Sequence, residues 1–174
     1  MICKIIEEIN KSLENETYLS ALSLALTLPD ICAKAEFGDV GNKKRYIDWW
    51  DKYISPYEQV EEFPYLSGEV IYELRCNYLH QGSIDVNKEK IKDNVCKIDD
   101  LILIVSDRNS FGIYFDLSTD RDFDGRKKYY LDINRLCYLI TVNAKKCFED
   151  NPERYSFLKR NIYDIRKTRT DANV

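Results

Sequence analysis

Apolar residues follow helical spacing near both ends of this chain, and a stretch with a different spacing separates them. Near the N-terminus, steps of three or four positions carry a stripe made of Ile2, Ile5, Ile6, Ile9 and Leu13. Towards the C-terminus, a longer stripe comprises Ile133, Leu136, Cys137, Ile140, Ala144, Cys147 and Phe148. Between them, the continuous apolar run 101–105 is typical of a buried strand. We therefore expect a mainly α-helical bundle with a small β insert.

Further helices are expected between these stripes and after the second one. Their approximate ranges are 18–28, 31–36, 43–54 and a last one that begins at 152. The helix 18–28 is either separate from the first or continuous with it. Ser67 is a favoured N-cap residue and Gly82 a favoured helix stop, so the sequence also predicts a helix between them. Asp132 can likewise cap the helix that carries the second stripe.

The β insert is expected over residues 99–131. Its predicted strands are 101–105, 111–117 and 128–131. Asp124-Gly125 is a turn signal before the last of them, and short strands joined by turns favour an antiparallel sheet of two or three strands. A chain of 174 residues has an ordinary size for one domain, so we expect residues 1–174 to form a single domain that contains the insert.

The chain is acidic overall, with a formal net charge of −4 and a pI near 5.2. Such a chain does not attract nucleic acid through its total charge, so any contact with RNA needs a local basic patch. Lys43, Lys44 and Arg45 are the candidate substrate-binding residues for such a patch. Basic residues also cluster at 126–128 and 159–169, and for every cluster a solvated surface is the alternative.

The six cysteines indicate reduced, mostly buried thiols, because none of them forms a C-x-x-C pair. Residues 120–125 begin like a calcium-binding loop, but Leu131 stands where the closing glutamate belongs, so a polar hairpin loop is expected. We expect neither a metal nor a cofactor. The longest apolar run is too short to span a bilayer and follows glutamates rather than basic residues, so we expect a cytoplasmic protein that does not bind membranes.

The chain contains a single histidine, His80, which lies five positions after Arg75. Histidine is the side chain that most readily transfers protons near neutral pH. Arginine stays charged and holds phosphate oxygens with two parallel hydrogen bonds. RNA carries its own nucleophile, the 2′-hydroxyl group, so this pair suits RNA cleavage without a metal. Arg75 and His80 are therefore the candidate catalytic residues.

The spacing Arg75-x4-His80, near the end of a predicted helix in a small helical bundle, resembles the HEPN superfamily (higher eukaryotes and prokaryotes nucleotide-binding domains). The phrase that carries the resemblance to a bacterial branch is Leu74-Arg75-Cys76…Leu79-His80-Gln81-Gly82-Ser83. In that superfamily an R-x4-6-H motif typically forms a metal-independent endoribonuclease site, often shared across a homodimer. The resemblance implies products with a 2′,3′-cyclic phosphate. It also implies a toxin or phage-defence protein with a cognate antitoxin or another protein partner, although other members are inactive.

Asn77 is a candidate polar helper of this site. The superfamily usually has a polar residue directly after the arginine, whereas this chain has Cys76 there and Asn77 one step later. On an ideal helix, five steps leave Arg75 and His80 roughly 140° and about 7.5 Å apart. They can act on one phosphate if the helix distorts before Gly82, if the Arg75 side chain reaches around it, or if a second subunit completes the site.

A structural interpretation stands beside the catalytic one. Arg75 can pair with a carboxylate such as Asp30, Glu36 or Asp48, and His80 can form a hydrogen bond at the end of the bundle. The chain would then be a catalytically silent helical module that binds a protein partner or a nucleotide. A substitution of His80 distinguishes the two, since only a nuclease loses RNA cleavage while it keeps its fold.

Overall fold

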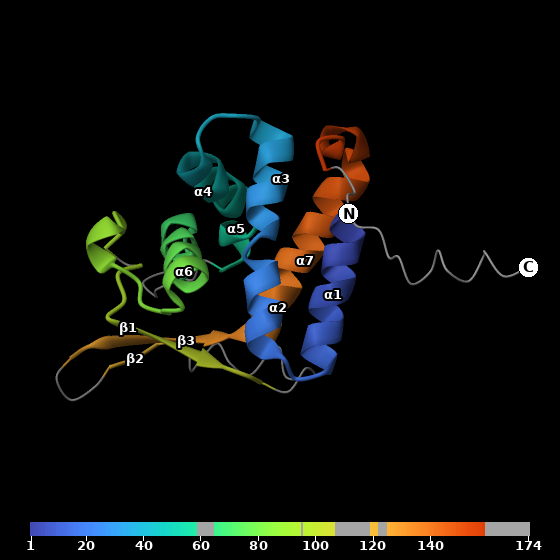
Figure 1. Cartoon of the computed structure of the whole chain (residues 1–174). Helices are drawn as coiled ribbons and strands as arrows, with labels where there is room; N and C mark the ends of the chain where they lie inside the picture. The colour runs from blue at the N-terminus through green and yellow to red at the C-terminus, as the bar shows by residue number, and fades with distance from the viewer. Residues whose placement is uncertain (59–64, 95, 107–118, 122–124, 159–174) are drawn as a thin grey trace, which may run out of the picture.

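The computed structural model describes residues 1–58, 65–94, 96–106, 119–121 and 125–158. Its α-helices are α1 (Ile2–Glu14), α2 (Tyr18–Ala25), α3 (Leu28–Phe37), α4 (Asn42–Tyr53), α5 (Ser55–Glu58), α6 (Gly68–Gln81) and α7 (Ile133–Asp150). The 3₁₀ helices are η1 (Lys88–Lys90) and η3 (Pro152–Tyr155), and the strands are β1 (Asp100–Ile104), β2 (Thr119–Arg121) and β3 (Lys127–Asp132) (Figure 1). The described chain is therefore mainly α-helical, as predicted.

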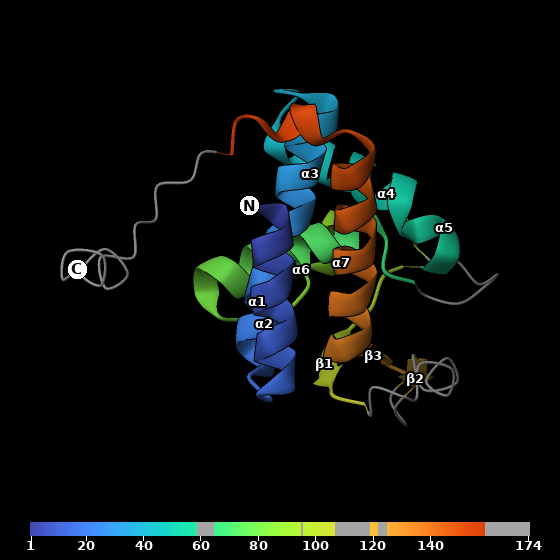
Figure 2. The same cartoon turned by 90° about the vertical axis from the view of Figure 1, so that its right-hand side faces the viewer.

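The helices form two groups that are joined by α3. Helices α1, α2 and α7 pack against one another, and Figure 2 shows α1 and α7 side by side. Helix α3 packs against α7 and also against α4, which in turn packs against α6. In Figure 1, α4 and α6 lie on the opposite side of α3 from α1, with the sheet across one end of the bundle. Trp49, Trp50 and Tyr46 of α4 are completely buried and are among the largest side chains of the core.

Helices α1 and α2 are separate because the chain reverses between them. Glu16 adopts a φ of 56°, which is incompatible with a right-handed helix. The apolar run 18–28 is divided between α2 and the first residue of α3. Pro29 lies in the first turn of α3, where a missing N–H group costs the helix no hydrogen bond.

The sheet is mixed, which corrects the predicted antiparallel arrangement. Strands β1 and β3 pair in parallel, with Leu101 opposite Tyr129 and Leu103 opposite Leu131. Strand β2 pairs with β3 in the antiparallel direction, and the strand order is β1-β3-β2. The prediction assumed that each strand turns back on the one before it. Parallel pairing needs a crossover connection of about a dozen residues or more, and the chain between β1 and β3 is long enough to provide it.

Local signals at both ends of α6 and at the start of α7 predicted those boundaries correctly. Ser67 Oγ accepts the N–H group of Val70 at 3.4 Å, and Gly82 ends α6 with a φ of 67°. Asp132 Oδ1 accepts the N–H group of Asn134 at 3.0 Å at the start of α7. Where the last helix was predicted to begin, the described residues form only the single 3₁₀ turn η3 and no α-helix. Residues 159–174, with their basic cluster, and the expected strand 111–117 lie outside the described residues.

Gly68 allows α6 to approach α4 closely. A Cβ atom at this position would lie 2.8 Å from the carbonyl oxygen of Ile47 and 2.9 Å from its Cα atom. Because both are backbone atoms, only a glycine fits there without a shift of one helix. The close contact fixes the start of the helix that carries Arg75 and His80.

All six cysteines are free thiols, and four of them are buried, as predicted. Burial raises the pKa of the Cys32 and Cys137 thiols to about 12, so both stay protonated at neutral pH. In the part of the chain that the structure describes, no helix combines the length and the apolar character needed to cross a membrane.

Candidate functional site

Helix α6 brings Arg75 and His80 together within a single chain. Nη1 of Arg75 lies 3.4 Å from Nε2 of His80. The helix is continuous from Gly68 to Gln81, so it does not distort between the two residues. Of the three arrangements that the spacing allows, the structure has the second: the long Arg75 side chain reaches around the helix.

In this contact, the Nε2 atom of the His80 ring faces Arg75. A guanidinium group has only donors, so a hydrogen bond between the two side chains requires Nε2 of His80 to be the acceptor. His80 is exposed in the last turn of α6, and solvent reaches its ring. An unprotonated ring nitrogen beside a fixed cation can take a proton from a hydroxyl group, while the cation stabilises negative charge that develops nearby.

The guanidinium group of Arg75 is also paired with a carboxylate. Its Nη2 lies 2.8 Å from Oδ2 of Asp30 in the first turn of α3, and the two side chains are only 23% and 20% exposed. Glu36 and Asp48, the other carboxylates that the sequence offered, pair with lysines instead. Among the described residues, the buried Nε of Arg75 has no hydrogen-bond partner. Arg75 therefore links α3 to the His80 end of α6.

Two neutral tyrosines flank the Arg75–Asp30 pair. Burial raises the pKa of Tyr46 well above its usual value, and burial together with a hydrogen bond to Cys76 raises the pKa of Tyr72 to about 12. Burial by itself lowers the pKa of Arg75, but the Asp30 carboxylate and the Cys76 thiol outweigh it, so the pKa of Arg75 is raised. The two tyrosines therefore add no charge to the Arg75–Asp30 pair at neutral pH.

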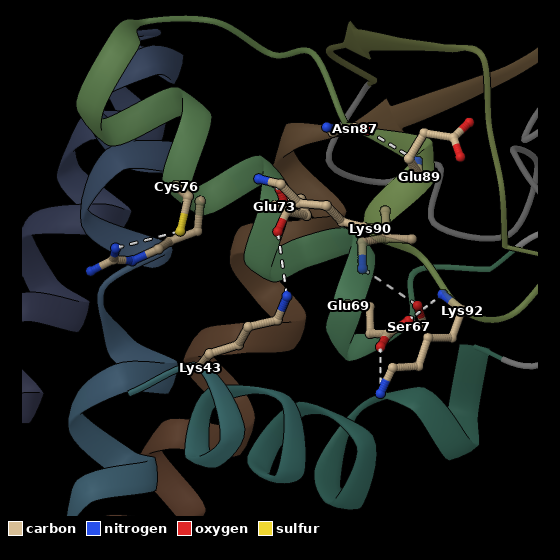
Figure 3. A network of polar contacts seen from close by, with 11 residues as sticks. Lys43, Ser67, Glu69, Glu73, Cys76, Asn87, Glu89, Lys90 and Lys92 are labelled. Atoms are coloured by element: carbon tan, nitrogen blue, oxygen red, sulfur yellow. Dashed lines mark hydrogen bonds and ion pairs between the residues drawn. The ribbon is translucent and has the colours of Figure 1, made fainter. Parts of the chain in front are cut away.

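The polar face of α6 holds the segment that follows the helix (Figure 3). Glu73 is only 2% exposed and pairs with Lys90 of η1 at 2.8 Å. One turn earlier, the carboxylate of Glu69 accepts the backbone N–H group of Lys92 at 2.6 Å. Because a buried carboxylate needs partners, these contacts fix the segment along the helix. This face has a structural role.

Asn77 also holds this segment, since its Nδ2 donates to the carbonyl oxygen of Asp85 at 2.6 Å. We expect Asn77→Ala to lower the free energy of unfolding by about 0.5–1.5 kcal/mol, the usual net value of one hydrogen bond. The rate of RNA cleavage should fall much less in Asn77→Ala than in His80→Ala. Urea denaturation and a cleavage assay measure the two effects. Asn143→Ala, which removes a similar bond to the Leu139 carbonyl on α7, is the matched control. A hundredfold loss of cleavage at unchanged stability would instead place Asn77 in the catalytic site.

The three residues of the predicted basic patch pair with different carboxylates. Nζ of Lys43 lies 3.6 Å from the Glu73 carboxylate and 5.6 Å from the centre of the Tyr72 ring, so this lysine faces α6. Lys44 and Arg45 pair with carboxylates of α4 and of the preceding loop. Only Lys43 of the three is therefore a neighbour of the residues around Arg75.

Sequence reasoning named Asp30 only as a rival partner for Arg75, and it missed Tyr72. The available signal for Tyr72 was its spacing: it lies three and four residues before Arg75 and Cys76, which puts all three on adjacent rows of one helix. For Asp30 there was no local signal, because it reaches Arg75 from another helix. Over the described residues, no group of three or more His, Cys, Asp or Glu side chains is arranged to hold a metal ion.

Comparisons of the chain with protein-family models, with curated proteins and with solved structures gave no match. The functional interpretation therefore depends on the chemistry of α6 and its neighbours.

Proposed function

We propose that this protein is a metal-independent endoribonuclease of the HEPN type, with Arg75 and His80 as its catalytic residues. The observation that carries the proposal is the 3.4 Å contact between Nη1 of Arg75 and Nε2 of His80. It puts a proton acceptor and a permanent cation side by side at the solvent-exposed end of α6. The resemblance of the Arg75-x4-His80 spacing to the HEPN motif supports the same chemistry.

The proposed reaction starts when the scissile phosphate enters between the two side chains. His80 takes the proton of the 2′-hydroxyl group, and the 2′-oxygen attacks the phosphorus atom. Arg75 donates to the non-bridging oxygens and stabilises the charge that develops on them. The bond to the 5′-oxygen then breaks, and that oxygen takes a proton from water. The products carry a 2′,3′-cyclic phosphate and a 5′-hydroxyl group.

The biological setting of this proposal comes from the resemblance alone. We propose an RNA-binding homodimer that acts in the cytoplasm as a toxin or in phage defence, with a cognate antitoxin or another protein as its partner. The contact within one chain means that a second subunit is not needed to bring Arg75 to His80. In a dimer, the second subunit would instead add surface that binds RNA.

The direct test is incubation of the protein with RNA in the presence of a metal chelator. We expect cleavage products that end in a 2′,3′-cyclic phosphate, identified by mass spectrometry. The matched control is the same oligonucleotide with a single 2′-deoxy residue at the cleavage position, which should stay intact because it lacks the nucleophile. Cleavage that requires a divalent metal, or that persists at the deoxy position, would contradict the proposed chemistry.

A catalytically silent helical module is the second candidate, and the Arg75–Asp30 pair favours it. A guanidinium group whose charge is compensated at 2.8 Å by a carboxylate attracts a phosphate less than a free one. In that case the pair would stabilise the packing of α6 on α3, and the protein would bind a protein partner or a nucleotide. Absence of cleavage for all RNA substrates, combined with a loss of stability when His80 is replaced, would support this candidate.

A further inference from the structure

The Arg75 side chain needs an external anchor to reach His80. On a regular helix the two residues leave the axis in directions roughly 140° apart. Helix α6 is continuous through both positions, so its backbone does not reduce that angle. An arginine side chain has several freely rotating bonds. Without a partner it samples many conformations, because conformational entropy opposes holding it in the one that reaches His80.

Asp30 is placed to provide the anchor. Its Oδ2 holds Nη2 of Arg75 at 2.8 Å, while Nη1 of the same planar group contacts His80 at 3.4 Å. Because both nitrogens are bonded to one carbon in a rigid plane, holding Nη2 in place restricts the positions that Nη1 can take. The two contacts therefore lie on one rigid group that spans from α3 to the end of α6.

Asp30 itself lies on a rigid part of the fold. It follows Pro29 in the first turn of α3, where the helix dipole stabilises a negative charge. Helix α3 is packed against both α4 and α7. Tyr46 of α4 is completely buried beside the ion pair, and its hydroxyl group donates to the Leu26 carbonyl oxygen just before α3. The carboxylate thus has a fixed position relative to α6.

We propose that Asp30 is the positioning residue of the site: it holds the Arg75 guanidinium group on the His80 side of α6, and so sets the geometry for RNA cleavage. This inference rests on the proposed ribonuclease function. Asp30 acts through Arg75 and does not itself touch the substrate. The competing interpretation is that Asp30 blocks the phosphate site by compensating the charge of Arg75, and the two interpretations predict opposite effects on substrate binding.

The test compares Asp30→Ala and Asp30→Asn with Glu36→Ala. Glu36 is the matched control because it is an ion-paired carboxylate on the same helix whose partners are Lys52 and Tyr53. A misplaced catalytic group typically reduces the rate by up to about 100-fold, so we expect Asp30→Ala to lower kcat by about 10- to 100-fold. Asp30→Asn retains an oxygen that accepts a hydrogen bond, and it should recover part of that loss. Glu36→Ala should leave kcat unchanged.

A lower KM with unchanged kcat in Asp30→Ala would overturn the proposal and support the blocking interpretation. A second measurement does not depend on activity. Because His80 is the only histidine, its ring gives a single set of imidazole proton signals in NMR spectra. These signals should shift in Asp30→Ala, where Arg75 leaves the ring, and stay in place in Glu36→Ala. Unchanged signals in Asp30→Ala and in the milder Asp30→Asn would also overturn the proposal.

The two proposals can fail separately. If the wild-type protein cleaves no RNA while the His80 signals shift in Asp30→Ala as expected, then the ribonuclease function is wrong and the anchoring of Arg75 is correct. If the wild-type protein cleaves RNA and neither kcat nor the signals respond to Asp30→Ala, then the function stands and the anchoring is wrong.

Discussion

Replacement of His80 by alanine is expected to lower RNA cleavage at least about a hundredfold, because general acid–base catalysis by a side chain typically contributes 10²- to 10⁴-fold. The fold should persist, since His80 is exposed and lies in the last turn of α6. No other histidine can replace it. The measurement is the rate of cleavage under single-turnover conditions, which reports the chemical step rather than product release.

Gln81→Ala is the matched control for this substitution. Gln81 is the exposed neighbour of His80 in the same turn of α6, so its loss changes the surface without touching the Arg75 contact. The free energy of unfolding of both variants should lie within about 0.5 kcal/mol of the wild-type value, the usual range for surface substitutions. If His80→Ala cleaves RNA at the wild-type rate, or if it loses stability rather than cleavage, then His80 has a structural role.

The longer helices could be predicted from the sequence because their signals are local. The stripe from Ile133 to Phe148 defines α7 by its period alone, and Asp132 marks the start with a side-chain hydrogen bond. Ser67 marks the start of α6 and Gly82 marks its end. Each of these signals acts over a few residues, so no knowledge of the rest of the fold is needed to interpret it.

The sheet could not be predicted in the same way, because strand order and direction depend on residues far apart in the chain. The apolar run 101–105 correctly indicated β1, but nothing in it specifies that its neighbour is β3 in the parallel direction. A period of two defines a strand and its faces, and it leaves the partner open. The turn signal at Asp124-Gly125 favoured a hairpin, and the antiparallel β2–β3 pair is only one part of the sheet.

The candidate site shows the same division between local and distant information. The spacing identified Arg75 and His80 as candidates, but ideal helix geometry placed them on different faces, and an ion pair of Arg75 was the alternative to catalysis. In the structure Arg75 makes both contacts, because its two terminal nitrogens can serve different partners. That outcome depends on where Asp30 lies in space.

Replacement of Arg75 by alanine is expected to have two separable effects. Cleavage should fall by about 10²- to 10³-fold, the usual loss when a donor that stabilises developing negative charge is removed. Stability should fall by about 1–3 kcal/mol, because the partly buried Asp30 carboxylate loses its partner. Cleavage rates and urea denaturation of the same preparations measure the two effects.

Arg135→Ala on α7 is the matched control, since Arg135 pairs with Glu58 and its side chain is 22% exposed, nearly the same as Arg75. It should also reduce stability, and its folded fraction should cleave RNA at the wild-type rate. Normal cleavage by Arg75→Ala would exclude Arg75 from the reaction and leave it a purely structural role between α3 and α6.

The double variant Asp30→Asn/Arg75→Ala separates the two roles of Arg75. Neutralising Asp30 removes the unpaired charge, so the double variant should be more stable than Arg75→Ala by about 1 kcal/mol. Its cleavage should stay as low as that of Arg75→Ala, because stability is restored without the cation that the phosphate needs. If the double variant recovers cleavage together with stability, then the loss in Arg75→Ala reflects unfolding and Arg75 takes no part in the chemistry. A double variant that regains stability while its cleavage rate stays low is expected only if the guanidinium group acts on the substrate.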